Sequence, residues 1–402
     1  MKKLTLAALL VITPVTFAET LEHVEEEVHM AMEIIQQLKA EINELKAAVK
    51  MQGEVQDASV SRIAKAAKKF EKMHIGGYGE LHYADTETDG GTKSKSVDAH
   101  RFVLFFGYDF TDKVRFRSEF ELEHALVVDT SDGSSAGEVE LEQMYIEWDV
   151  TDQTTLKTGV ILVPVGILNE NHEPPIFYGV ERNDVEKYII PTTWWAAGVE
   201  IVHRMPNGLT FEAMISEGLE GATSMYIRGG RQKSASAVAN DLAYTARISY
   251  TGIPGLKASA FYNHQADFTQ LSSDNINKMD LYGASAIYEW GDGFEARVLH
   301  VQAQFDGVDE SGASFTAGFD EQQGTFLEIS KRTGNFGIFA NNSVVSGESV
   351  SRQYTVVQYG ISYWIQGTNA VLKANWYDKS YPNPSKNSSE SDGIHLGMGY
   401  EF

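Results

Sequence analysis

The chain has 402 residues, a formal net charge of −23 at pH 7 and no cysteine. Without thiols, the sequence excludes disulfide scaffolds, thiolate metal sites and cysteine nucleophiles. So acidic a chain is also a poor partner for nucleic acid, because phosphate backbones bind basic surfaces. We therefore expect a protein that meets small solutes and ions in water, with no cofactor.

Residues 1–18 have the pattern of a secretory signal peptide. Lys2 and Lys3 give a basic start, residues 4–12 give a short apolar core, and small residues precede Glu19 at the usual cleavage spacing. Cleavage there removes two lysines and takes the net charge from −23 to −25. The signal-peptide pattern predicts export. No later run of about eighteen apolar residues occurs, so the sequence predicts no helical membrane span.

Residues 21–50 repeat in heptads, which predicts a left-handed coiled coil. Branched residues at position a with leucine at position d favour two strands, whereas Met32 and Ile34 widen the apolar face and favour more than two. A single amphipathic helix folded back on the protein is the alternative. We assign residues 19–72 to a coiled coil followed by a basic linker. The seam residues are Leu21, Val24, Val28, Ala31, Ile35, Leu38, Ile42, Leu45 and Val49.

After Met73 the apolar period changes from seven to two. In residues 114–122, apolar side chains alternate with charged ones, as in a strand between an apolar and an aqueous environment. In a barrel the apolar face contacts lipid and the charged face lines water. Sixteen such segments can be counted, at 73–84, 97–110, 114–128, 138–150, 155–163, 196–205, 208–216, 240–251, 256–265, 279–290, 294–305, 323–332, 335–345, 354–365, 369–379 and 392–402.

The connections alternate between tight turns, such as 111–113 and 206–207, and longer polar loops, such as 217–239 and 306–322. This alternation is typical of outer-membrane barrels, in which the turns are periplasmic and the loops external. The sequence therefore predicts an all-β fold, a 16-stranded antiparallel transmembrane β-barrel over residues 73–402, with the coiled coil in the periplasm. Strands that descend to the turns end in aromatic residues, which predict an interfacial girdle: Phe110, Trp148, Tyr250, Trp290, Trp364 and Phe402.

The longest connection is residues 164–195, in which Pro174 and Pro175 stiffen the chain and four aromatic residues can pack it against the wall, namely Phe177, Tyr178, Trp194 and Trp195. A loop of this length is usually functional, and folded inward it narrows the lumen of a sixteen-stranded barrel. This stretch, with the preceding GVILVP and the following AAGVEI, resembles the phosphate-selective porin O and P family, as do the coiled-coil start, the strand count and the terminal Phe402. The resemblance implies a homotrimeric outer-membrane porin constricted by its third loop. Its surroundings would be lipid and lipopolysaccharide, and the barrel-assembly machinery would insert it.

The charges of the expected pore do not follow the family name. Phosphate selectivity relies on arginine and lysine clusters in a narrow filter. Here glutamates on the same strand faces balance the positive charge of the arginines. These charges set up a transverse field or pair along the wall, and both interpretations stay open. We expect passive diffusion of small hydrophilic solutes and ions, with a phosphate- or anion-selective channel as the alternative. The pore-lining and constriction candidates are Arg101, Arg115, Arg117, Glu119, Glu121, Glu123, Glu170, Glu173, Glu181 and Arg182.

An outer-membrane hydrolase is a competing hypothesis from another class. It needs a serine beside a histidine at one membrane height. Asn263 and His264 are adjacent positions of one strand and face opposite sides. His172-Glu173 does not continue into the zinc-protease helix motif, because two prolines follow. We find no assembled catalytic group and expect no enzyme.

A structural tether of the cell envelope, built on the coiled coil and its basic stretch, is the second competitor. The sequence has no recognisable peptidoglycan-binding module ahead of the barrel. The most basic external segment holds Arg228, Arg231 and Lys233, which are candidates for contact with lipopolysaccharide or for simple solvation.

Overall fold

The structure is a computed structural model that describes residues 28–44, 68–125, 127, 137–221, 226–271, 278–306, 321–347, 353–382 and 390–402. The predicted signal peptide, residues 1–18, lies outside the described residues, as do the heptad positions before 28 and after 44. Residues 72–402 form one compact unit, and the N-terminal residues belong to another.

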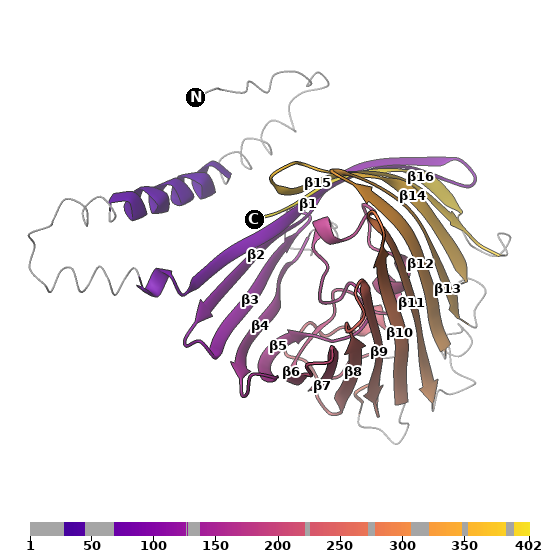
Figure 1. Cartoon of the computed structure of the whole chain (residues 1–402). Helices are drawn as coiled ribbons and strands as arrows, with labels where there is room; N and C mark the ends of the chain where they lie inside the picture. The colour runs from indigo at the N-terminus through magenta and orange to yellow at the C-terminus, as the bar shows by residue number, and fades with distance from the viewer. Residues whose placement is uncertain are drawn as a thin grey trace, which may run out of the picture. The chain divides into compact units, whose positions relative to one another are not determined.

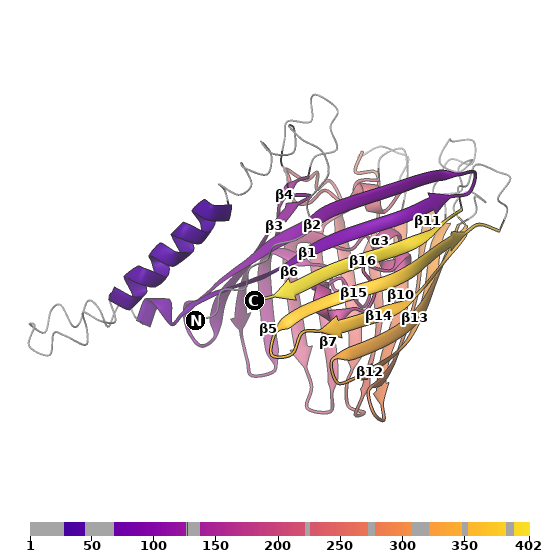
Figure 2. The same ribbon diagram turned by 90° about the horizontal axis from the view of Figure 1, so that it is seen from above.

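The unit over residues 72–402 is a closed antiparallel barrel in which each strand pairs with its neighbours in the chain and β1 pairs with β16 (Figure 1; Figure 2). Closure matters physically, because it leaves no edge strand with unpaired backbone groups. The strands are β1 (Met73–Thr88), β2 (Thr92–Asp109), β3 (Val114–Glu123), β4 (Val139–Asp149), β5 (Thr154–Leu162), β6 (Trp195–Arg204), β7 (Leu209–Glu217), β8 (Leu242–Tyr250), β9 (Leu256–Gln265), β10 (Lys278–Trp290), β11 (Phe294–Asp306), β12 (Glu321–Thr333), β13 (Phe336–Gly347), β14 (Tyr354–Trp364), β15 (Asn369–Ser380) and β16 (Ser391–Glu401).

The predicted fold of sixteen strands is confirmed, and most strand ends agree within two residues. The largest differences concern β2, which begins at Thr92 rather than at 97, and β3, which ends at Glu123 rather than at 128. The β1–β2 hairpin is longer than predicted because it is polar on both faces, so apolar alternation cannot reveal it. In place of an apolar face, the hairpin has cross-strand ion pairs, between Lys93 and Glu87 at 3.2 Å and between Lys95 and Asp85 at 2.8 Å.

The two faces of the wall differ as the period-two pattern predicts. In β3, Phe120 is 45% exposed on the outside, whereas its neighbours Glu119 and Glu121 are at most 1% exposed on the inside. Of the residues predicted for the aromatic girdle, Phe110, Trp148, Trp290 and Phe402 are exposed, and Tyr250 is partly exposed. Trp364 is an exception to the predicted girdle. It is buried and faces inward, where its ring packs against Tyr178 with ring centroids 5.5 Å apart.

Residues 28–44 form an α-helix whose apolar seam is exposed in the single chain. Val28, Ile35 and Leu38 are each more than half exposed. Helix formation over this segment agrees with the heptad analysis, but a coiled coil requires a second helix and stays a prediction. None of the helices in the described part of the chain is long and apolar enough to cross a membrane.

The lipid-facing assignment predicts the effect of a charge at the middle of β16. Leu396 is 44% exposed on the outer surface, and an arginine there should cost about 2–4 kcal/mol of folding free energy in a bilayer. Urea titration of folding into liposomes measures this for Leu396→Arg, with Leu396→Met as the control that should change little. Equal midpoints for the two variants would contradict a lipid-facing position.

Candidate functional site

The segment 163–194, between β5 and β6, lies inside the barrel (Figure 1; Figure 2). We call it the inner loop. Its base is tied by Asn169, whose side-chain nitrogen donates to the carbonyl oxygens of Val163 and Trp194, both at 2.8 Å. The side-chain oxygen of Asn169 accepts from the Trp194 backbone at 2.7 Å. One buried amide therefore joins the two ends of the loop.

A short helix and a buried carboxylate give the inner loop its shape. The helix α3 (Asp184–Tyr188) begins after Asn183, whose side chain accepts a hydrogen bond from the Glu186 backbone at 2.9 Å. The Glu186 carboxylate accepts from the backbone nitrogen of Leu168 at 2.6 Å. Gly166 has a φ of +73°, and a β-carbon there would lie 2.6 Å from this carboxylate. Only glycine meets both requirements, a positive φ and no β-carbon beside the carboxylate.

Hydrogen bonds from the opposite wall hold the middle of the inner loop. Lys373 of β15 donates to the carbonyl oxygen of Gly179 at 2.8 Å, and Ser362 of β14 donates to that of Tyr178 at 2.9 Å. Asn375 of β15 accepts from the backbone of Val180 at 3.0 Å. Because the loop starts at β5, these contacts show that it extends across the barrel interior.

Glycines of β16 make room for this approach. A β-carbon at Gly399 would lie 2.2 Å from Pro174, which begins the 3-10 turn η2 (Pro174–Ile176), and one at Gly397 would lie 2.9 Å from Val180. Inward-facing glycines in the terminal strand therefore mark where the inner loop meets the wall. The glycines are visible in the sequence and could have indicated this contact, but a prediction from apolar periodicity does not take them into account.

Part of the interior is apolar, which corrects the expectation that the inward face is uniformly wet. Leu281, Leu299 and Val301, on β10 and β11, point inward and are fully buried. They belong to an apolar cluster with Val185 and Ile190 of the inner loop. The cluster seats the loop against β9–β13 in the same way as an ordinary hydrophobic core. Lumen-facing positions there read as apolar because a loop, not water, covers them.

The predicted residues of β2 and β3 lie on one wall, where the three arginines form ion pairs with neighbouring carboxylates. Arg101 is 3.0 Å from Glu80 and 3.5 Å from Glu121. The other pairs join Arg115 to Glu147 and Asp149, both at 2.6 Å, and Arg117 to Asp109 at 2.9 Å. Glu119 accepts a hydrogen bond from Gln143 at 2.5 Å, and Glu123 lies close to Glu138 and Glu140. The arginines are thus matched by carboxylates along the wall.

Two of the four predicted residues of the inner loop, Glu170 and Glu181, are paired with the wall. Glu170 forms an ion pair with Arg247 of β8, and Glu181 accepts a hydrogen bond from His82 of β1 at 2.9 Å. Arg182 stays within the loop region, where it donates to the hydroxyl of Thr193 at 2.9 Å. Glu173 has one buried carboxylate oxygen without a hydrogen-bond partner among the described residues. Sequence reasoning missed His82 and Arg247, because their partners are about one hundred and about eighty residues away.

The basic segment at 228–233 lies on the inner loop and on β4. Arg228, at the start of the 3-10 turn η3 (Arg228–Gly230), donates to the carbonyl oxygens of Lys187 and Thr192 at 2.7 and 2.9 Å. Arg231 donates to that of Thr193 at 2.6 Å. Burial and the neighbouring Arg231 charge lower the pKa of Arg228 to about 10. Arg228 and Arg231 therefore hold the inner loop in place, whereas Lys233 forms ion pairs with Glu138 and with Glu140 of β4.

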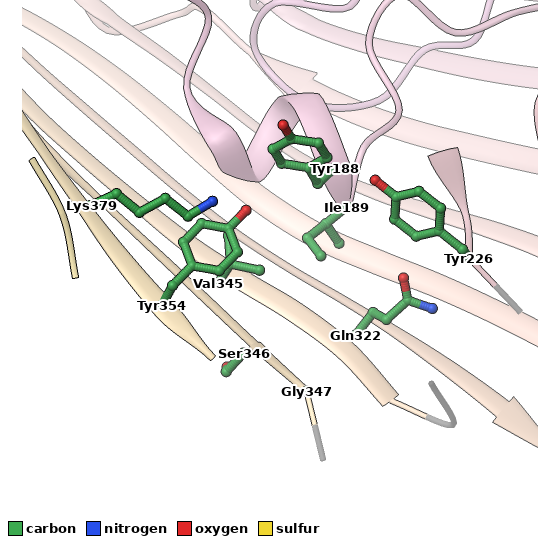
Figure 3. Close-up of a pocket in the computed structure, with 9 residues that line it drawn as sticks. All are labelled: Tyr188, Ile189, Tyr226, Gln322, Val345, Ser346, Gly347, Tyr354 and Lys379. Carbon is green, nitrogen blue, oxygen red and sulfur yellow. The ribbon is translucent and has the colours of Figure 1, made fainter. Parts of the chain in front are cut away.

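A cavity of about 270 Å³ opens beside α3, between the inner loop and β12–β15 (Figure 3). Tyr188, Tyr226 and Tyr354 line it together with Gln322 and Lys379, and the three tyrosine rings lie around one space in Figure 3. The ammonium group of Lys379 lies 3.7 Å from the centre of the Tyr354 ring. Aromatic faces beside an amide and a cation can hold small polar solutes at the surface of the loop.

Comparison with known proteins identifies a fold rather than a family. No family model matches the chain. An uncharacterized protein of Aquifex aeolicus (strain VF5) is 38% identical over 183 residues, which is 44% of this chain and 41% of that relative. The chain thus spans about two fifths of the length of the curated relative that it matches.

Solved outer-membrane structures share the barrel. An anion-selective porin from Comamonas acidovorans has a TM-score of 0.58 at 13% identity, covering 82% of this chain and 99% of its own. Salmonella typhi OmpF in complex with daunomycin has a TM-score of 0.57 at 10% identity, covering 82% and 97%. The outer membrane channel DcaP of Acinetobacter baumannii has a TM-score of 0.53 at 13% identity, again covering 82% and 97%. The fold of this chain is therefore that of the outer-membrane porins.

The contact between Glu181 and His82 predicts a pH dependence. Burial by itself raises the pKa of the Glu181 carboxyl, but the hydrogen bond from His82 and the charge of Lys187 hold it well below its usual range. A depressed carboxyl pKa stabilises the fold above the unfolded value, about 4.3 for glutamate. This stability is lost as pH falls through the folded value.

Glu181→Gln should therefore lose less stability than the wild type between pH 7 and pH 3.5. Urea midpoints in detergent at the two pH values measure the difference. Glu87→Gln, at an exposed pair on the β1–β2 hairpin, is the control and should keep the wild-type pH dependence. An unchanged pH dependence in Glu181→Gln would contradict the role of this contact.

Proposed function

We propose that the protein is an outer-membrane porin through which small hydrophilic solutes and ions diffuse passively. The observation that carries the proposal is a closed sixteen-stranded barrel, apolar outside, with charged residues and a long loop inside. Such a wall is stable in lipid and offers water a polar path. The signal peptide at residues 1–18 directs export, and residues 19–72 form a periplasmic coiled coil and basic linker.

The inner loop constricts this path. Its support is the set of wall contacts from β1, β14 and β15 that hold the loop in the interior rather than above it. Ile176 is the position that best reports on the constriction. It lies in η2, its carbonyl oxygen accepts from Arg297 of β11 at 2.9 Å, and its side chain is 40% exposed.

Thiol modification tests the constriction, because the chain has no cysteine of its own. In planar bilayers, a thiol-reactive reagent that carries a trimethylammonium group should lower the conductance of Ile176→Cys, since the attached group fills part of the narrowest section of the channel. Ser94→Cys, on the exposed β1–β2 hairpin, is the control and should keep its conductance. Complete modification of Ile176→Cys without a change in conductance would contradict the constriction. A well-inserted protein that conducts no ions would favour the envelope tether.

The channel is of mixed charge with a weak preference for cations. The inward arginines and lysines of five strands have carboxylate partners, which neutralise much of the field that an anion would follow. These pairs are Arg101–Glu80, Arg115–Glu147, Lys157–Glu200, Arg247–Glu212 and Arg297–Glu295. Phosphate selectivity, which the family resemblance suggests, would need arginines without carboxylate partners, so it stays the alternative.

Reversal potentials in a potassium chloride gradient should show this weak cation preference, and added phosphate should leave the conductance unchanged. The physical reason is that phosphate binding needs guanidinium groups free to turn toward the ligand. A strong anion preference together with phosphate block would overturn the charge argument and support the alternative.

The outer face of β9–β13 supports a homotrimer. At the middle of β11, His300 points outward and lies 2.9 Å from Thr325 of β12, and Asn342 of β13 also points outward. A groove of about 450 Å³ on this face is lined partly by Ala286 and Ala340. Polar side chains and a hollow surface are costly against lipid, so we assign this face to contact with other copies of the chain.

Two matched substitutions test this face. Ala284→Trp adds bulk beside His300 and should shift the native mass spectrum from trimer to monomer. Ala374→Trp makes the same change on the outward face of β15, where lipid accommodates a tryptophan, and should leave the trimer intact. Trimers in both variants would exclude β9–β13 as the interface.

A further inference from the structure

Three buried side chains converge between the inner loop and the wall. They are His172 of the loop, Glu119 of β3 and Glu142 of β4, and each is at most 2% exposed. Nε2 of His172 lies 3.3 Å from Oε1 of Glu119 and 3.4 Å from Oε2 of Glu142. None of these three atoms has a hydrogen-bond partner among the described residues. Unsatisfied polar atoms at this depth are costly, so the group requires a physical explanation.

The distances indicate what lies between these atoms. A charge-assisted N–H···O bond is about 2.7–2.9 Å long, and His82 in the same barrel makes such bonds to Glu181 and Glu80 at 2.9 and 3.0 Å. The His172 distances are longer. Two ligands at about 2.0–2.1 Å from a tetrahedral zinc ion are separated by about 3.3–3.4 Å. The spacing around His172 therefore fits an ion better than a shared proton.

The surrounding hydrogen bonds orient the three groups as metal ligands. Nδ1 of His172 donates to the carbonyl oxygen of Asn169 at 3.2 Å, which leaves the Nε2 lone pair directed at the carboxylates. Gln143 donates to the second oxygen of Glu119 at 2.5 Å. Metal-binding histidines and carboxylates are characteristically held by such outer contacts.

A β-bulge in β4 brings these groups together. Gln143 pairs with Glu119 and Leu141 pairs with Phe120, so Glu142 is the extra residue between them. The bulge turns Glu142 and Gln143 toward Glu119 at the same time. Bulges commonly re-aim side chains beside functional sites in this way.

The local charge also calls for a cation. Glu121 is fully buried beside the group and adds a third carboxylate. It lies 3.5 Å from Arg101, but Arg101 is shared with Glu80 at 3.0 Å. The nearby Arg182 donates instead to the Thr193 hydroxyl and to the carbonyl oxygen of His172. Buried carboxylates in this number are stable only with matching positive charge.

We propose that Glu119, Glu142 and His172 bind a divalent transition-metal ion, and that zinc fits the site best. One imidazole and two carboxylates suit zinc better than calcium or magnesium, which prefer oxygen ligands alone. The ion joins the inner loop to β3 and β4. The site is independent of whether the barrel conducts.

Isothermal titration with zinc chloride tests the site in the full chain refolded in detergent after treatment with a chelator. Wild-type protein should bind one zinc ion per chain at this site, and elemental analysis after desalting should retain it. His172→Asn and Glu142→Gln should weaken binding more than about tenfold. His395→Asn and Glu200→Gln are matched controls, a buried histidine and a buried glutamate from outside the site, and should bind as the wild type does. Wild-type protein without bound zinc, or His172→Asn with unchanged affinity, would overturn the proposal.

X-ray absorption of the zinc-loaded wild type decides the question if the variants fail to fold. One imidazole with oxygen ligands at about 2.0–2.2 Å supports the site. A shell with two or more imidazoles would place the ion at His82 and His100, or at His100 and His124, and would overturn the assignment.

Discussion

The structure depends on one constraint, that every backbone polar group in lipid must pair within the protein. Pairing of β1 with β16 meets it by closing the sheet. Closure then divides each strand into an outward and an inward face. The terminal strand shows the result, because Ile394, Leu396 and Met398 are exposed outside while His395 is buried inside.

The inner loop follows from the width of such a barrel. Sixteen strands enclose more space than their own side chains fill, and residues 163–194 occupy part of it. Apolar residues of β10 and β11 seat one side of the loop, whereas Lys373 and Ser362 bind its other side by hydrogen bonds. The interior is thus partly a hydrophobic core and partly a charged surface, and the charged surface carries the proposed path for solutes.

Sequence reasoning located the strands well, because a period of two survives wherever one face meets lipid. β9 was predicted at its observed bounds, and the β1–β2 hairpin was underestimated because both of its faces are polar. The contacts of the site were harder. Trp364 resembles a girdle residue in sequence, yet it packs on Tyr178, and His172 meets Glu119 only because the loop returns to β3. Such pairings depend on the path of the loop, which carries no periodic signal.

A cysteine scan over residues 394–399 of β16, in the otherwise cysteine-free chain, tests the central claim most directly. Nitroxide labels in liposomes should alternate with a period of two. Labels at 394, 396 and 398 should be accessible to lipid-dissolved oxygen, and labels at 395, 397 and 399 should be shielded from it. A uniform profile, or the opposite phase, would contradict a barrel whose outer face meets lipid.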